Sequence, residues 1–308
     1  MAGPIQIRMG GYGPPSTGFS RSLKFIGDRL TAQFGDRVDM KYAWNIMDLG
    51  YKAEEILWLV ESGLLTLGYQ SSSYLTDRVP ELGFVDLPFL FANNDHARGA
   101  MDGALGRRLV QATESKCNFR ILGWYENGFR HISNRVRPVR TPADLKGMRT
   151  RVLPSKIQAR TFELLGATPL IMDLTDAIRM IKAGELDAQE NPLTNTVTYG
   201  VHKFHRFHTI SNHFYISRPI FVHRPTFDGW PGDLKEAMQK AVTDSVTFQR
   251  ELHVKEEADA EQAIKAEGCE VVELNSSRHD AFAAAVQPIY AEAKALLGDE
   301  LFGLVKRG

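Results

Sequence analysis

Short apolar runs alternate with longer amphipathic segments along the first half of the chain. The apolar runs predict strands at residues 5–9, 38–42, 64–69 and 119–124, and the amphipathic segments predict helices at 18–34, 52–62 and 95–111. In the first of these helices the apolar residues recur at helical spacing and define an inward face: Phe19, Leu23, Phe25, Ile26 and Leu30. Regular alternation of strands and helices predicts an α/β fold with a parallel sheet covered by helices.

The second half continues with strands predicted at 149–152 and 188–191 and helices at 155–165 and 175–183. Residues 232–267 contain hardly a helix breaker, which predicts one helix of roughly 50 Å at about 1.5 Å per residue. A further helix is predicted at 277–297. Thr141, Pro142 and Asp144 have the spacing of a capping box with proline at the first helical position, so a helical turn should begin there.

Length and charge limit the classes of protein that need to be considered. The 308 residues are enough for about two domains. Lysine plus arginine number 37 and aspartate plus glutamate number 37, which argues against nucleic-acid binding because phosphate contacts need a basic excess. No apolar run approaches the roughly 20 residues that span a bilayer. Cys117 and Cys269 lack metal-type spacing and are expected to be unpaired, although a disulfide between them stays open.

Polar side chains stand at the ends of two predicted strands. Arg151 lies at the end of one short apolar strand, and Asn191 ends another about forty residues on. In open α/β sheets, ligands bind at the carboxyl ends of strands. A guanidinium can meet one carboxylate with two parallel hydrogen bonds, and an asparagine beside it can donate and accept. This arrangement predicts a site for an anionic small molecule.

The same stretch resembles the solute-binding proteins of TRAP transporters, the DctP-type family. The family pattern is a basic residue, an apolar residue, Arg-Val, then Leu-Gly-Ala-x-Pro, then Gly-x-x-Asp-Gly-Gln-Glu-Asn-Pro. Here Thr150 stands at the apolar position and Ala188 where glycine is usual. The resemblance covers nearly the whole chain, and the motifs that carry it lie at 86–91, 123–130, 133–134, 137–147, 149–154, 165–169, 184–192 and 211–213.

The resemblance implies a two-lobed periplasmic binding protein of type II-like α/β fold, with a hinge and a long lobe-spanning helix. We expect lobe I to contain residues 1–125 and 215–250, and lobe II to contain 126–214 and 251–308, with the chain crossing near 125–127 and 214–217. The implied function is an extracytoplasmic solute receptor. It binds an organic-acid carboxylate in the interlobe cleft, as a monomer, and delivers it to membrane subunits of a TRAP transporter.

The expected site residues combine positions that the resemblance implies with Tyr12 and Ser71, which follow predicted strands. Arg151 is the expected carboxylate ligand, and the others are Arg130, Asn191, Ser71, Tyr12, Leu174 and Asn212. No acid lies near Ser71, and Leu174 replaces a phenylalanine of sialic-acid-binding members, which argues against sialic acid as the ligand. No cofactor and no metal are expected. The resemblance implies a periplasmic location. The chain begins Met1-Ala2-Gly3-Pro4 with no secretory signal before residues 5–9, so either the chain is cytoplasmic or Met1 replaces a cleaved signal. The resemblance implies the second.

Each of these residues also has a structural interpretation. Arg151 could be an ordinary surface or paired arginine, and Arg149, on the same strand face, a solvated charge or a second cation on the ligand. Arg130 could form an internal ion pair. Asn191 could cap a helix starting at Pro192.

Other patterns give weaker signals. Glycines at 10–16 imitate a dinucleotide loop, but Pro14 and Pro15 lack the N–H groups that hold a pyrophosphate. His202, His205, His208 and His213 have no acid or cysteine to complete a metal set and are expected to be surface or hinge-region histidines. The remaining alternatives are an α/β enzyme acting on an anionic metabolite, and a sensor receptor of a signalling system.

Overall fold

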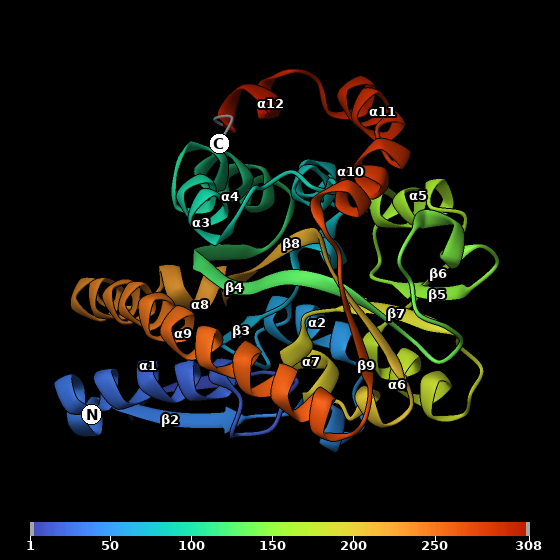
Figure 1. Ribbon diagram of the computed structural model, residues 1–308. Helices are drawn as coiled ribbons and strands as arrows, with labels where there is room; N and C mark the ends of the chain where they lie inside the picture. Colours follow the sequence, from blue (N-terminus) through green and yellow to red (C-terminus); the bar gives the residue numbers. More distant parts are fainter. Residues whose placement is uncertain (1–2, 306–308) are drawn as a thin grey trace. The chain divides into compact units, whose positions relative to one another are not determined.

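The computed structural model describes residues 3–305, which form two compact units. Unit 1 contains residues 3–71, 110–126 and 217–255, and unit 2 contains 72–109, 127–216 and 256–305. Four elements run from one unit into the other: α4 (Ala104–Lys116), β4 (Phe119–Asn134), β8 (Phe207–His223) and α9 (Gly232–Ala266). Figure 1 shows each of them as one continuous ribbon. Each unit is therefore assembled from three separate stretches of chain.

In unit 1, three parallel strands and one antiparallel strand form a small sheet. Strand β1 (Ile5–Gly10) pairs in parallel with β2 (Val38–Ala43) and β3 (Leu67–Tyr69), and β3 pairs antiparallel with residues 220–222 of β8. The helices wholly within this unit are α1 (Gly18–Phe34), α2 (Ile56–Glu61) and α8 (Arg224–Asp228). Helix α1 lies beside β2 and the first part of α9 (Figure 1), where Phe25 stacks on Phe248.

Unit 2 contains a second group of strands. Strand β5 (Arg149–Val152) lies between β6 (Thr168–Ile171) and β7 (Ala188–Asn191), parallel to both, while β7 pairs antiparallel with residues 131–134 of β4. Strand β9 (Glu270–Glu273) is parallel to residues 207–210 of β8. The helices of this unit are α3 (Asn94–Asp102), α5 (Lys156–Leu164), α6 (Leu174–Lys182), α7 (Leu193–Thr198), α10 (Ser276–Ala285), α11 (Pro288–Leu297) and α12 (Glu300–Leu304).

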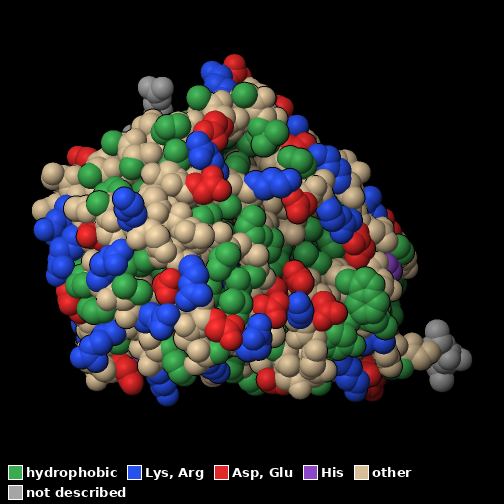
Figure 2. All heavy atoms as spheres, turned by 90° about the vertical axis from the view of Figure 1, so that its right-hand side faces the viewer, with side chains coloured by type: hydrophobic (Ala, Val, Ile, Leu, Met, Phe, Trp, Pro, Cys, Tyr) green, Lys and Arg blue, Asp and Glu red, His purple; other side chains and the backbone are tan. Residues whose placement is uncertain are grey.

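The core of unit 2 lies under β5 and β7. Val152 and Ala188 from these strands pack with Phe162 of α5, Phe214 of β8 and Phe282 of α10, all fully buried. This packing fixes the two strands whose ends carry Arg151 and Asn191. On the face shown in Figure 2, basic and acidic side chains are interspersed, as the equal numbers of the two charges lead one to expect. Between residues 3 and 305, no helix combines the length and apolarity needed to cross a bilayer.

Most predicted elements are confirmed, some to the residue. The helix at 18–34 and the strands at 149–152 and 188–191 have the predicted bounds, and the long helix runs from Gly232 to Ala266. The capping box at Thr141 is present and begins a short 3-10 helix, η6 (Pro142–Leu145). One residue predicted for the inward face of the helix at 18–34 was wrong, because Phe25 is only half-buried.

Several predictions about the elements were wrong, each for a local reason. The predicted helix 95–111 is two helices, because α3 ends at Gly103. The helix 277–297 is also divided, because Pro288 begins a new helix and cannot donate a backbone hydrogen bond within the first. The expected all-parallel sheet has antiparallel pairs, since β4 and β8 are long strands that sequence pattern alone did not reveal.

The boundary between the units differs in one segment from the predicted lobes. Residues 72–109, which we expected in lobe I, belong to unit 2. The hydrogen bonds from Ser73 and Gln158 to Asp86 show why, because they attach this segment to α5 of unit 2. The assignment of units to lobes stays a prediction.

Candidate functional site

Arg151 is the central residue of the candidate site. Its side chain is 1% exposed, and its neighbours are neutral: Nε donates to the Met172 carbonyl oxygen at 3.2 Å and Nη2 to the Tyr74 hydroxyl at 3.1 Å. No described residue forms an ion pair with it. Two of its five N–H groups are thus used. Burying a cation without a counter-charge is costly, and no described carboxylate offsets that cost for this guanidinium.

Tyr74 holds Arg151 in place and was missed by the sequence analysis. It lies in the 3-10 helix η4 (Ser72–Leu75), and its hydroxyl accepts from Arg151 and also from the backbone N–H of Leu174 at 3.0 Å. Leu174, one of the predicted site residues, is buried as the first residue of α6. Tyr74 therefore joins the arginine to the start of that helix. In the sequence, Tyr74 is marked as a candidate site residue only by its place in the polar run that follows β3.

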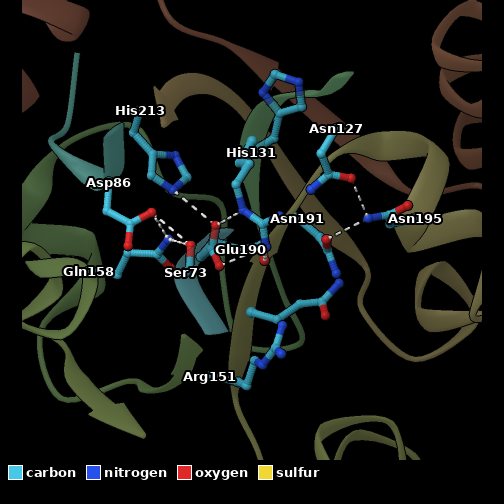
Figure 3. Close-up of polar contacts among 12 residues, drawn as sticks. Ser73, Asp86, Asn127, His131, Arg151, Gln158, Glu190, Asn191, Asn195 and His213 are labelled. Carbon is cyan, nitrogen blue, oxygen red and sulfur yellow. Dashed lines mark hydrogen bonds and ion pairs between the residues drawn. The ribbon is translucent and has the colours of Figure 1, made fainter. Parts of the chain in front are cut away.

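Asn191 lies on the same sheet face as Arg151. Arg151 pairs with Gln189 across β5 and β7, and Asn191 follows Gln189 by one period of two. Its Oδ1 accepts from Asn195 Nδ2 at 3.1 Å, and the same nitrogen donates to Asn127 Oδ1 (Figure 3). Asn191 does not cap α7, whose N-cap is Pro192. The network leaves the Asn191 amide nitrogen as a donor for a ligand.

Gln189 belongs to this face as well, although we did not single it out. Its side chain is 1% exposed, its Nε2 donates to Thr196 at 3.3 Å, and its Oε1 is buried without a hydrogen-bond partner. Such an acceptor suits a ligand hydroxyl. Arg149, two residues before Arg151, is exposed and paired with Asp187 at 3.2 Å, as expected of a solvated charge.

Arg130 is paired inside unit 2. Its Nε and Nη2 donate to the two carboxylate oxygens of Glu190, and both side chains are buried. Burial raises the pKa of Glu190, but the charge and hydrogen bonds of Arg130 together with those of His213 outweigh it, so the pKa lies below its usual value. The internal ion pair that the sequence left open as the structural interpretation of Arg130 is therefore present, with Glu190 as its partner. A ligand contact for Arg130 stays a prediction.

The four histidines of 202–213 are not surface residues, so the sequence expectation was wrong. All four are less than 9% exposed. Ser133 contacts His205 Nδ1 at 2.9 Å, and His208 Nε2 lies 2.9 Å from the His205 carbonyl oxygen. His213 Nε2 lies 3.7 Å from the Glu190 carboxylate, as Figure 3 shows. They fill the interior beside β4 and β8. Burial lowers the pKa of His205 to about 3 and that of His208 to about 4.

A second buried acid supports the segment that carries Tyr74. Asp86 Oδ1 accepts from Ser73 Oγ at 2.7 Å and from Gln158 Nε2 at 3.1 Å, whereas Oδ2 has no partner (Figure 3). Burial raises the pKa of Asp86 to about 6. These bonds attach η4 to α5 and so position Tyr74 against Arg151.

The remaining predicted residues lie elsewhere. In unit 1, Tyr12 and Ser71 are 3% and 2% exposed; the Tyr12 ring packs on Tyr69, and Ser71 Oγ has no hydrogen-bond partner.

In unit 2, Asn212 is exposed, has a left-handed backbone with φ of 47°, and lines a cavity of about 330 Å³ with Phe89, Asn93 and Phe129. The lining of that cavity contains none of the other predicted site residues. Cys117 and Cys269 form no disulfide in the part of the chain that the structure describes.

Two α/β units that share long strands, with a buried arginine at the end of a strand facing neutral groups, define a solute-binding protein. The chain belongs to the DctP family, bacterial extracellular solute-binding protein family 7, whose family model matches residues 41–295. It is a solute receptor of the TRAP-transporter type, as the sequence motifs predicted. The relatives and the solved neighbours are solute-binding proteins rather than enzymes, and the family is extracellular.

Similar proteins support this family over most of the chain. A solute-binding protein of Verminephrobacter eiseniae is 29% identical over 240 residues, which is 78% of this chain and 70% of the relative. The C4-dicarboxylate-binding periplasmic protein DctP of Rhodobacter capsulatus is 28% identical, with 74% and 68% covered. The sugar acid binding protein DctPAm of Advenella mimigardefordensis, solved with galactonate, has a TM-score of 0.93 at 26% identity, with 99% and 98% covered.

Proposed function

We propose that this chain binds a small organic acid through one carboxylate held by Arg151, and that it delivers the acid to membrane subunits of a TRAP transporter. The location is the periplasm, and the receptor acts as a monomer. The observation that carries this proposal is the surrounding of Arg151, which is buried against two neutral oxygen acceptors with no fixed anion.

The geometry of Arg151 limits how the carboxylate binds. Nε and one hydrogen of Nη2 are occupied by Met172 and Tyr74. The two Nη1 hydrogens and the second Nη2 hydrogen remain, so a carboxylate would meet the outer end of the guanidinium. Two charge-assisted hydrogen bonds of about 1.5–3 kcal/mol each would supply much of a micromolar affinity, which is about −8 kcal/mol.

The neighbouring residues would recognise the rest of the acid. Asn191 presents an amide donor and Gln189 an unpaired carbonyl on the same sheet face, and Leu174 supplies an apolar contact. From unit 1 we retain Ser71 and Tyr12 as ligand contacts. Arg130 and Asn212 carry less weight, because the first is neutralised by Glu190 and the second lines a separate cavity.

A substitution series tests the role of Arg151. We expect Arg151→Ala to abolish binding of organic acids in calorimetry, and Arg151→Lys to bind at least about tenfold more weakly than wild type, since an ammonium cannot replace the planar fork. The probes are galactonate, D-erythronate, pantoate and succinate. Arg149→Ala is the matched control, since this arginine lies on the same strand but is exposed and paired with Asp187.

The outcomes are clear for each variant. Arg149→Ala should bind as wild type does, and circular dichroism should show all variants folded. Near wild-type affinity in Arg151→Ala and Arg151→Lys would disprove the role of Arg151. Hits from neutral sugars alone in a thermal-shift screen would disprove the assignment of a carboxylate ligand.

A further inference from the structure

Unit 2 contains a cavity of about 330 Å³ that lies apart from the proposed carboxylate site. Four parts of the chain line it, namely the segment 89–94 that leads into α3, β4, β8 and α10. Pockets that bind small molecules begin at about 300 Å³, and an apolar cavity of about 150 Å³ already holds benzene. The cavity therefore has room for a molecule of about one or two rings.

The walls of the cavity are largely aromatic. Phe91 and Phe129 each meet the buried Tyr215 ring edge-on, with ring centres 5.7 Å and 5.3 Å from that of Tyr215. Phe89 and His279 form another edge-on pair, with ring centres 4.7 Å apart. Aromatic rings pack on a further ring in edge-on or offset geometry and gain more than the buried area alone provides. Walls of this kind favour a flat ring as the ligand.

One hydrogen-bond acceptor in the lining has no partner. Asn94, the first residue of α3, has its side-chain Oδ1 buried without a hydrogen bond. Asn93 beside it differs, because its Oδ1 caps α3 by accepting from the His96 backbone N–H at 2.9 Å. A buried acceptor without a partner costs free energy, so the cavity favours a ligand with an N–H or O–H group.

The lining also limits the charge of the ligand. Among the described residues that form it, there is no lysine, arginine, aspartate or glutamate. A charged group taken out of water needs a counter-charge, and these side chains do not supply one. The cavity is therefore suited to a neutral molecule, which separates it from a site for organic acids.

The backbone beside the cavity is strained. Between residues 3 and 305, Phe89 and Asn212 are the only residues other than glycine with a positive φ, 58° and 47°, and both line the cavity. Asparagine adopts this left-handed conformation readily, whereas a bulky side chain does so rarely. The Phe89 N–H donates to the His213 carbonyl oxygen at 2.8 Å, which fixes the strained residue against β8. Strain of this kind clusters at ligand sites.

We propose that this cavity is a second binding site, which takes a small neutral molecule with an aromatic ring and an N–H or O–H group. Phe89, Phe91 and Phe129 contact the ring of this ligand, and Asn94 Oδ1 accepts its hydrogen bond. The site lies wholly within unit 2. The inference does not rest on the proposed function, because Arg151 takes no part in the lining.

Indole and N-methylindole test the hydrogen bond, because only the first can donate an N–H. In ligand-observed NMR titrations we expect wild type to bind indole with a Kd of about 1 mM or tighter. N-methylindole should bind about fivefold more weakly, the loss of one neutral hydrogen bond. Asn94→Leu removes the acceptor at nearly constant size, so the ratio of the two Kd values should fall to about one. Asp95→Leu is the control, since Asp95 follows Asn94 in α3, is exposed and does not line the cavity.

Two further variants test whether the probes bind in this cavity. His279→Trp places a larger side chain in the lining and should weaken the binding of both probes about tenfold or more. Phe129→Leu removes a ring from the wall at a half-buried position, so it keeps the test available if the first variant does not fold. It should weaken both probes about threefold or more. Circular dichroism checks the fold of each variant.

Several results would overturn the inference. They are no detectable binding of indole to wild type at about 5 mM, wild-type binding of both probes in the folded variants of His279 and Phe129, and a wild-type ratio of Kd values in Asn94→Leu. Arg151→Ala should bind indole as wild type does. Loss of indole binding in that variant would place the probe at the carboxylate site and would also overturn the inference. Failure of the organic-acid titrations leaves these results unchanged, so the two proposals fail separately.

Discussion

Three buried arginines of this protein show how the surroundings of a guanidinium decide its role. Arg130 meets the Glu190 carboxylate, Arg151 meets two neutral oxygens, and Arg218 meets only rings. The first arrangement is complete in itself, so it serves the fold. The other two keep N–H groups that no described carboxylate pairs with. Burial alone therefore does not distinguish the three arginines, whereas the presence or absence of a carboxylate partner does.

The Arg130–Glu190 pair should contribute strongly to stability. Glu190→Gln keeps the size of the side chain but removes the charge opposite Arg130, so we expect the free energy of unfolding to fall by about 3–5 kcal/mol, as for other broken buried pairs. Urea unfolding followed by circular dichroism measures this change. Glu270→Gln is the control, since Glu270 forms a pair with Arg140 in which both side chains are exposed, and it should cost about 1 kcal/mol or less. Similar losses in the two variants would contradict the argument.

Arg151 could be predicted from sequence because its neighbours along the chain carry the pattern. Glu190 was visible in the same motif, but nothing in the sequence joined it to Arg130, which lies sixty residues away. Arg218 gave no signal, since one arginine in an apolar strand resembles many surface arginines. Tyr74 acts through a hydroxyl whose partners lie far along the chain. Pairings of this kind depend on strand order, which local patterns do not contain.

At the scale of elements, the junction between α3 and α4 depends on a glycine. A Cβ at Gly106 would lie 1.6 Å from the Met101 carbonyl oxygen, and a backbone atom there cannot move aside without shifting a helix. The absence of a Cβ at Gly106 permits this close approach, just after the point where the amphipathic pattern from 95 to 111 divides into two helices. The hydrophobic periodicity correctly predicts helical structure, but it contains no information on how closely the end of one helix approaches the start of the next.

Gly106→Ala should therefore destabilise the protein, by about 1–3 kcal/mol as for other forced overpacking. Gly99→Ala provides the comparison, because a Cβ at Gly99 within α3 meets nothing within 4 Å. There, alanine should raise the free energy of unfolding by about 0.5–1 kcal/mol through its better helix propensity. Thermal unfolding of both variants measures the difference. Equal effects in the two would show that the junction is not constrained.

At the scale of the whole molecule, buried titrating groups determine how stability depends on pH. Burial lowers the pKa of His131 and His205 to about 3 and that of His208 to about 4, so the folded protein holds them neutral while the unfolded chain protonates near 6.5. Their contribution is present above pH 6.5 and is lost as the pH falls. Asp86, with its pKa raised to about 6, acts in the opposite sense between pH 4 and 6.

Between pH 5 and 6, the three histidines outweigh the one carboxyl, so the unfolded chain binds about two more protons than the folded protein. The free energy of unfolding should therefore fall by about 2.7 kcal/mol for each pH unit by which the pH decreases. Urea midpoints at pH 7.5, 6 and 5 measure this slope. Asp86→Asn should make the slope steeper, because the opposing group is removed. A flat profile between pH 5 and 7.5 would contradict the buried neutral histidines.

The pairing of β3 with β8 has a consequence for how the chain is made. Strand β3 ends at Tyr69, but its partner residues in β8 lie at 220–222. On a ribosome that adds about 5–20 residues per second, roughly 8 to 30 s separate the synthesis of the two strands. During that interval the first three strands of unit 1 exist with an incomplete sheet and an exposed edge. We expect the nascent chain to stay open to chaperones until β8 has emerged.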